Sequence, residues 1–129
     1  MNGYQLFFIK SKCRKQDFIK ETKQKYDEEF NYMCIDKSSS AFNMYKREIK
    51  SELTIIHSLF GKDFYSLAKC ASRDDVLYYV RDNNKTYYIV IHLTFKHNEN
   101  SKFLNYKIFN NILDVKEYLV KQYLDDFID

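Results

Sequence analysis

Hydrophobic residues recur along this chain at two different spacings, and the spacing changes with position. Between residues 41 and 60 they lie three or four positions apart, which places them on one side of a helix. The pattern predicts a helix over Ala41–Phe60, preceded by the hydroxyl side chains of Ser38–Ser40 as N-cap candidates and followed by Gly61, which suits a left-handed C-cap. The stripe consists of Phe42, Tyr45, Ile49, Leu53, Ile56 and Phe60.

Two further helices are predicted from the same period. The first covers Lys15–Met33, and its shared side carries Phe18, Thr22, Tyr26, Phe30 and Met33. The second covers Ile112–Phe127 and opens after Asn110–Asn111, since asparagine favours helix N-caps. Its predicted buried residues are Ile112, Val115, Leu119, Tyr123 and Phe127.

The segments between and before these helices have the composition of strands. Runs rich in aromatic and β-branched residues predict strands over Tyr4–Ile9, Phe64–Cys70, Asp75–Arg81, Thr86–Lys96 and Phe103–Phe109. The polar residues Asp82–Lys85 separate two of them and predict a tight hairpin turn, because asparagine tolerates a positive φ.

The longest strand has one apolar face and one mixed face. Tyr88, Val90, His92 and Thr94 alternate with the apolar set Tyr87, Ile89, Ile91, Leu93 and Phe95. Strands joined by short turns form an antiparallel meander. We therefore expect a single α+β domain over residues 1–129, with an antiparallel meander sheet of four to five strands and three helices packed on one face.

The composition narrows the class of protein. Of the 129 residues, 45% are hydrophobic and 30% charged, which is typical of a globular chain. Cys13, Cys34 and Cys70 are odd in number and lack close spacing, so neither a disulfide framework nor a structural zinc site is expected. Without a membrane-length apolar run or a signal-peptide leader, the sequence favours a cytoplasmic protein that does not associate with membranes.

Catalysis and cofactor binding are not expected. The chain has two glycines, Gly3 and Gly61, too few for a phosphate-cradling loop, so no cofactor held by backbone amides is predicted. The three histidines do not share a metal-ligand spacing, so no metal is predicted, and no small-molecule substrate is expected. Cys70 and His92 could lie near each other if their strands pair, but no motif marks Cys70 as an activated nucleophile. A small enzyme with His92 in a pocket is a third hypothesis, considered after the protein-binding and nucleic-acid-binding hypotheses given below.

Charge is unevenly distributed. Residues 10–25 contain seven basic and two acidic residues, whereas residues 112–129 contain two basic and five acidic residues. The basic stretch, Lys10–Lys25, supports a nucleic-acid-binding regulator as an alternative function, although nucleic-acid binders concentrate more positive charge. The acidic end would instead steer the molecule onto a basic partner.

The strand Tyr87–Phe95, followed by a polar loop, an aromatic strand and a final helix, resembles small bacterial proteins with a V-H-L-T-W-like strand. These are immunity partners of secreted toxins, including toxins of contact-dependent growth inhibition systems. The resemblance covers residues 76–128, and Phe95 stands in place of the tryptophan. It implies a cytosolic protein that blocks a cognate toxin domain by surface contact, and it transfers no binding residues.

The leading hypothesis is therefore a protein-binding module of the immunity type, whose partner is a toxin domain such as a nuclease with a basic cleft. The candidate partner-binding residues are the acidic side chains of the last segment and two tyrosines, because tyrosine is enriched at interfaces. They are Asp114, Glu117, Asp125, Asp126, Asp129, Tyr118 and Tyr88.

Overall fold

The computed structural model describes residues 17, 19–22, 32–53, 58–95 and 104–127. Residues 17 and 19–22 are helical, and seven elements follow them along the chain. These are β1 (Tyr32–Cys34), α2 (Ser40–Glu52), β2 (Asp63–Cys70), β3 (Asp75–Asp82), β4 (Lys85–His92), β5 (Asn105–Phe109) and α3 (Ile112–Phe127). The predicted strand Tyr4–Ile9 lies outside the described residues.

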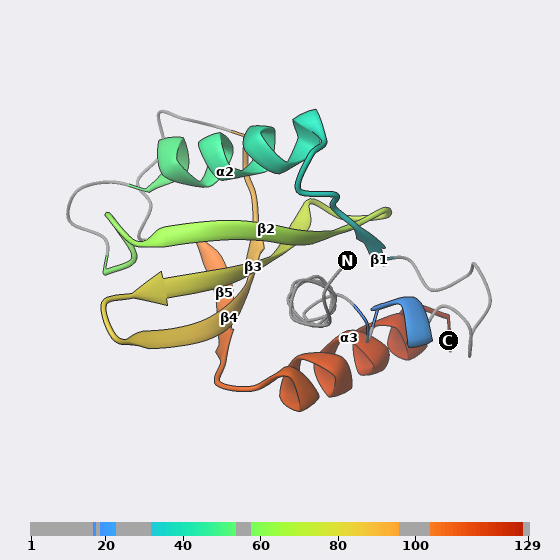
Figure 1. Cartoon of the computed structure of the whole chain (residues 1–129). Coiled ribbons are helices and arrows are strands. Elements are labelled where there is room, and N and C mark those ends of the chain that lie inside the picture. Colours follow the sequence, from blue (N-terminus) through green and yellow to red (C-terminus); the bar gives the residue numbers. More distant parts are fainter. Residues whose placement is uncertain (1–16, 18, 23–31, 54–57, 96–103, 128–129) are drawn as a thin grey trace, which may run out of the picture.

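The strands form one open antiparallel sheet in the order β1-β2-β3-β4-β5 (Figure 1). The α+β class and the antiparallel meander are thus confirmed. The turn between β3 and β4 is tight, with Asn83 at a φ of 55°. The register of β3 and β4 pairs Asp82 with Lys85 beside the turn and Asp75 with His92 at the far end of the hairpin. This pairing positions the candidate site described below.

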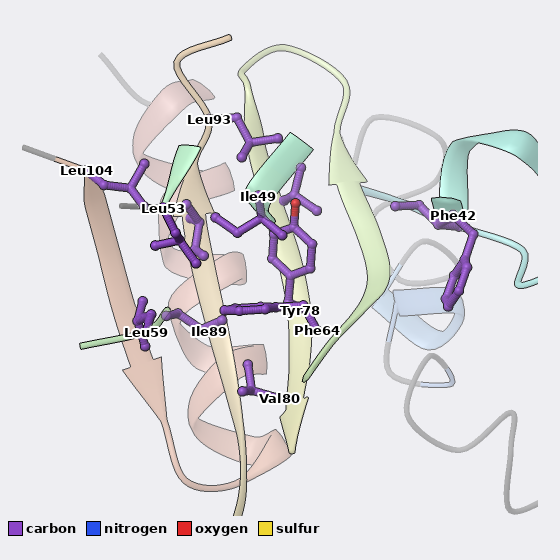
Figure 2. Close-up of a cluster of buried hydrophobic side chains, with 13 residues drawn as sticks. Phe42, Ile49, Leu53, Leu59, Phe64, Tyr78, Val80, Ile89, Leu93 and Leu104 are labelled. Atoms are coloured by element: carbon purple, nitrogen blue, oxygen red, sulfur yellow. The ribbon is translucent and has the colours of Figure 1, made fainter. Parts of the chain in front are cut away.

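The first core lies between the sheet and α2. Ile49 of α2 and Tyr78 and Ile89 of the sheet are fully buried, and Figure 2 draws them with the rest of this cluster. Two polar contacts join the layers: the Tyr78 hydroxyl donates to the Tyr45 carbonyl over 2.8 Å, and the Ser66 hydroxyl donates to the Phe42 carbonyl over 3.1 Å. Apolar burial therefore holds α2 on the sheet, and these two bonds fix its position.

A second core lies on the opposite face, under α3 (Figure 1). Val115 and Leu119 of α3 are fully buried against a cluster that includes Leu77 and Val90 of the sheet. The expectation that all helices pack on one face is therefore wrong. The physical reason is visible in β3, where Val76, Leu77 and Tyr78 are consecutive and all buried, which requires cover on both faces.

Several predicted boundaries also differ. Residues 32–34 form β1, so the helix predicted to reach Met33 ends earlier, and β4 ends at His92 instead of Lys96. The helix predicted to reach Phe60 ends at Glu52, with Leu53 already extended. Gly61 does have a positive φ, 81°, but it lies in the turn that precedes β2. None of the described helices is long and apolar enough to cross a membrane.

The capping predictions had mixed outcomes. Ser39 is the N-cap of α2, yet its hydroxyl makes no capping bond and donates to the Asp36 carbonyl over 2.6 Å. Asn111 does cap α3, because its side-chain oxygen accepts a hydrogen bond from the backbone N–H of Asp114 over 2.9 Å. The predicted bounds of α3 are confirmed.

Two buried tyrosines predict how stability depends on pH. Burial raises the pKa of Tyr78, with Glu52 adding to the effect, and burial raises that of Tyr32, with Asp75 adding. In the unfolded chain both lose their protons near pH 10, so above that pH the folded state binds more protons and stability falls as pH rises. We expect the free energy of unfolding to fall above about pH 10 by up to ~1.4 kcal/mol per pH unit for each tyrosine.

Urea unfolding at several pH values between about 8 and 11 measures this slope. Tyr78→Phe removes one of the groups that titrate in this range and should make the decline shallower, although the lost bond to Tyr45 lowers stability at every pH. An equal decline in Tyr78→Phe and in the unmodified protein would contradict the assignment.

Candidate binding surface

The first turn of α3 gives Asp114 a structural role. Its backbone N–H donates to the side-chain oxygen of Asn111, and the Asn111 amide group donates back to the Asp114 carboxylate over 3.1 Å. A negative charge here also lies at the positive end of the helix dipole. Asp114 is exposed, as a partner-binding residue needs to be, and it also stabilises the start of the helix.

The side chains that α3 exposes form what we call the α3 surface. Tyr118 is half-buried, and it shares one side of the helix with Asp114, Lys121 and Asp125, because residues three and four apart are neighbours on a helix. Leu113 is 68% exposed and adds an apolar side chain to this surface. The α3 surface consists of Leu113, Asp114, Glu117, Tyr118, Lys121 and Asp125.

The other predicted residues are placed differently. Tyr88 lies on the α3 side of the sheet, half-buried, with its ring centroid 5.4 Å from that of Tyr79. It therefore packs against the core more than it extends the α3 surface. The side chain of Asp126 and the whole of Asp129 lie outside the described residues. Most of the basic stretch Lys10–Lys25 lies outside them as well, and Lys20, which is described, is exposed.

A polar depression of about 220 Å³ adjoins this surface, between α3 and the ends of β3, β4 and β5. We call it the His92 recess. Its lining includes the basic side chains of Arg73 and Lys107, the imidazole of His92 and the carboxylate of Asp75. Tyr118 belongs both to this lining and to the α3 surface. The lining residues are Arg73, Asp75, Val90, His92, Asn105, Tyr106, Lys107, Tyr118 and Gln122.

A chain of hydrogen bonds crosses the recess. Nδ1 of His92 lies 2.8 Å from Oδ1 of Asp75, and the Gln122 amide donates to the other Asp75 oxygen over 3.3 Å. The Tyr32 hydroxyl in turn donates to the Gln122 side-chain oxygen over 3.2 Å. Because a carboxylate only accepts, Nδ1 carries a hydrogen and Nε2 is the ring nitrogen left for a ligand.

Burial differs sharply within this chain of bonds. The Asp75 side chain is 9% exposed, whereas that of His92 is 50% exposed. A nearly buried carboxylate needs partners that satisfy its oxygens, and His92 and Gln122 supply them. Asp75 therefore orients the histidine from below, while one side of the imidazole ring remains in solvent.

Tyr118 and Lys107 form the other side of the recess. The Lys107 ammonium lies 4.8 Å from the centroid of the Tyr118 ring, within the range of a cation–π contact, and the Phe109 ring packs 5.2 Å from the same ring. Burial raises the pKa of Tyr118, Asp75 raises it further, and the Arg73 charge opposes both. Tyr118 is thus close enough to Asp75 and Arg73 to sense their charges.

The size of the recess limits what it can hold. Pockets that enclose small-molecule substrates usually measure about 300–1,000 Å³, so this recess fits one side chain or a small ion. Within the described part of the chain, no three potential metal ligands gather at one place. Cys70 and His92, which could lie near each other if their strands pair, each contact another residue. Cys70 is buried and its sulfur lies 3.5 Å from the Ser72 hydroxyl, while His92 is hydrogen-bonded to Asp75.

Comparisons with protein-family models, with curated proteins and with solved structures found no match.

The sequence patterns did not single out the other polar residues of the recess, which are Arg73, Asp75, Asn105, Tyr106, Lys107 and Gln122. The predicted strand begins at Asp75, as β3 does, but the pairing of Asp75 with His92 was not predicted. A signal was present, because counting back from the tight turn at Asp82–Lys85 places residue 75 opposite residue 92. The sequence gives no comparable signal that Gln122 of α3 and Arg73 of the loop before β3 line the same recess.

Proposed function

We propose that this protein is a protein-binding module of the toxin-immunity type, which acts in the cytoplasm and neutralises a cognate bacterial toxin domain by surface contact. The observation that carries the proposal is the α3 surface, where an exposed leucine, a half-buried tyrosine and alternating charges lie along one helix. The resemblance of residues 76–128 to immunity proteins supports the narrower part of the proposal.

The dimensions of α3 suit a protein partner. Its 16 residues extend over about 24 Å, comparable to the width of an interface that buries roughly 800 Å² on each partner. Tyrosine and leucine supply buried contact area, while the surrounding charges set orientation and association rate. Lys121 lies between the acidic residues Glu117 and Asp125, so a matching partner needs complementary charges of both signs and not a uniformly basic cleft.

The direct test is co-expression with the toxin domain encoded beside this protein, followed by growth measurement and by titration of the purified pair. We expect growth to be restored and a stable complex to form. Tyr118→Ala combined with Asp125→Lys should weaken the complex by at least about tenfold, because one contact aromatic is lost and one steering charge is reversed. Asp125→Lys alone changes an exposed side chain and should chiefly slow association.

Arg47→Glu is the matched control. Arg47 is exposed on α2, which covers the opposite face of the sheet, so its charge reversal should leave the affinity unchanged. If Arg47→Glu strengthened the complex by as much as Asp125→Lys weakened it, net charge, and not the α3 surface, would control binding, because the two substitutions change the net charge by equal amounts in opposite directions. If instead the purified protein turned over a substrate and His92→Gln abolished that turnover, the His92 recess would be an active site and the proposal would be wrong.

A further inference from the structure

The His92 recess has more basic than acidic side chains in its lining. Arg73 and Lys107 are both exposed and both basic, and Asp75 is the one carboxylate among the lining residues. Even with His92 neutral, the lining therefore carries one net positive charge. An excess of cationic donors in a small concave site favours an anion.

Asp75 competes little for those donors. One of its oxygens lies 2.8 Å from the His92 ring nitrogen, and the other accepts a hydrogen bond from Gln122. Both oxygens are therefore engaged, and the Asp75 side chain is nearly buried. Arg73 and Lys107, which are both exposed, supply the basic side chains of the lining.

The two cations are held on a defined framework. The Lys69 ammonium donates to the backbone carbonyls of Cys70 and Arg73 and lies 4.0 Å from the Asp74 carboxylate, which fixes the loop that carries Arg73. The end of β4 is bonded to the same loop, because the Leu93 N–H donates to the Asp74 carbonyl over 2.9 Å. Lys107 is positioned over the Tyr118 ring.

We propose that the His92 recess binds an oxyanion, either a carboxylate or a phosphate group, between the side chains of Arg73 and Lys107. Planar guanidinium groups bind carboxylate and phosphate through paired hydrogen bonds, and an ammonium group adds a point charge beside them. The volume of about 220 Å³ accommodates such a group and little more. This inference concerns the recess alone and does not depend on the protein partner proposed above.

Titration of the ¹⁵N-labelled protein with inorganic phosphate and, separately, with acetate at constant ionic strength tests the proposal. We expect saturable shifts centred on His92, Asn105 and Lys107. Arg73→Gln and Lys107→Gln should each weaken binding by about tenfold, the usual effect of losing one charge-assisted hydrogen bond. Lys85→Gln removes the same charge at the β3–β4 turn, outside the recess, and should leave the affinity unchanged.

Phosphoserine and glutamate, titrated as free amino acids, distinguish the two sources of the anion. Tighter saturable binding of phosphoserine would assign the recess to phosphorylated ligands, and tighter binding of glutamate would assign it to acidic side chains. Absence of saturable binding by any of these anions would overturn the proposal. Equal loss of affinity in Lys107→Gln and Lys85→Gln would also overturn it, since it would indicate general screening of charge.

Discussion

Replacement of Glu52 by alanine is expected to lower the free energy of unfolding by about 2–4 kcal/mol. Glu52 ends α2 and is 4% exposed. One carboxylate oxygen accepts hydrogen bonds from the Thr94 backbone N–H over 2.7 Å and from the Thr94 hydroxyl over 2.8 Å. The other accepts from the Phe95 backbone N–H over 3.1 Å. Alanine would leave all three donors without this partner.

The same contacts explain why the chain changes direction here. Phe95 has a φ of 56°, a conformation that is unfavourable for a large side chain, and the bond from its N–H to Glu52 helps to hold it. Glu52→Ala should therefore also increase hydrogen exchange at residues 94 and 95. Urea unfolding gives the loss of stability, and exchange measured by NMR gives its location.

Two variants control this experiment. Glu52→Gln keeps one carbonyl oxygen for Thr94 but presents an amide group to the Phe95 N–H, so it should lose less stability than Glu52→Ala. Asn43→Ala changes an exposed position of the same helix and should change stability by less than about 0.5 kcal/mol. A loss below that value in Glu52→Ala would show that these hydrogen bonds contribute little.

Leu119→Ala, on the opposite face of the sheet, is expected to lower the free energy of unfolding by a similar amount, about 3 kcal/mol. Leu119 is fully buried in the cluster that joins α3 to Leu77 and Val90. Truncation removes its apolar surface from the core and leaves a cavity, and both terms lower stability. Denaturant unfolding measures the change.

Leu113→Ala is the matched control, because it makes the same substitution in the same helix at a side chain that is 68% exposed. It should change stability by less than about 0.5 kcal/mol. If Leu119→Ala and Leu113→Ala lowered stability equally, α3 would not cover the sheet in the way described. The α3 residues Tyr118 and Gln122 would then not line the His92 recess.

Most elements of the fold could be predicted because their determinants are local. Alternation set β4, the tight turn at Asp82–Lys85 set the hairpin, and Asn111 set the start of α3. The consecutive apolar residues Val76–Tyr78 also indicate burial on both faces of the sheet, whereas the apolar and mixed faces of the longest predicted strand led to the prediction of helices on one side only.

The end of α2 and the recess could not be predicted in the same way. Apolar spacing continued to Phe60, yet α2 ends at Glu52, whose carboxylate bonds residues 42 and 43 positions later in the chain. The recess likewise collects Arg73, His92, Lys107 and Gln122 from a loop, two strands and a helix. Such convergence depends on tertiary packing, which periodicity does not encode.

Mapping the interface of the complex by amide chemical shifts would show whether the toxin domain binds the α3 surface, since it reports every surface of the molecule at once. With the cognate toxin domain bound, we predict that the largest changes fall on α3, around Leu113, Tyr118 and Asp125, and continue to Lys107 across the recess. Changes confined to α2, with α3 unaffected, would mean that the partner does not bind the α3 surface.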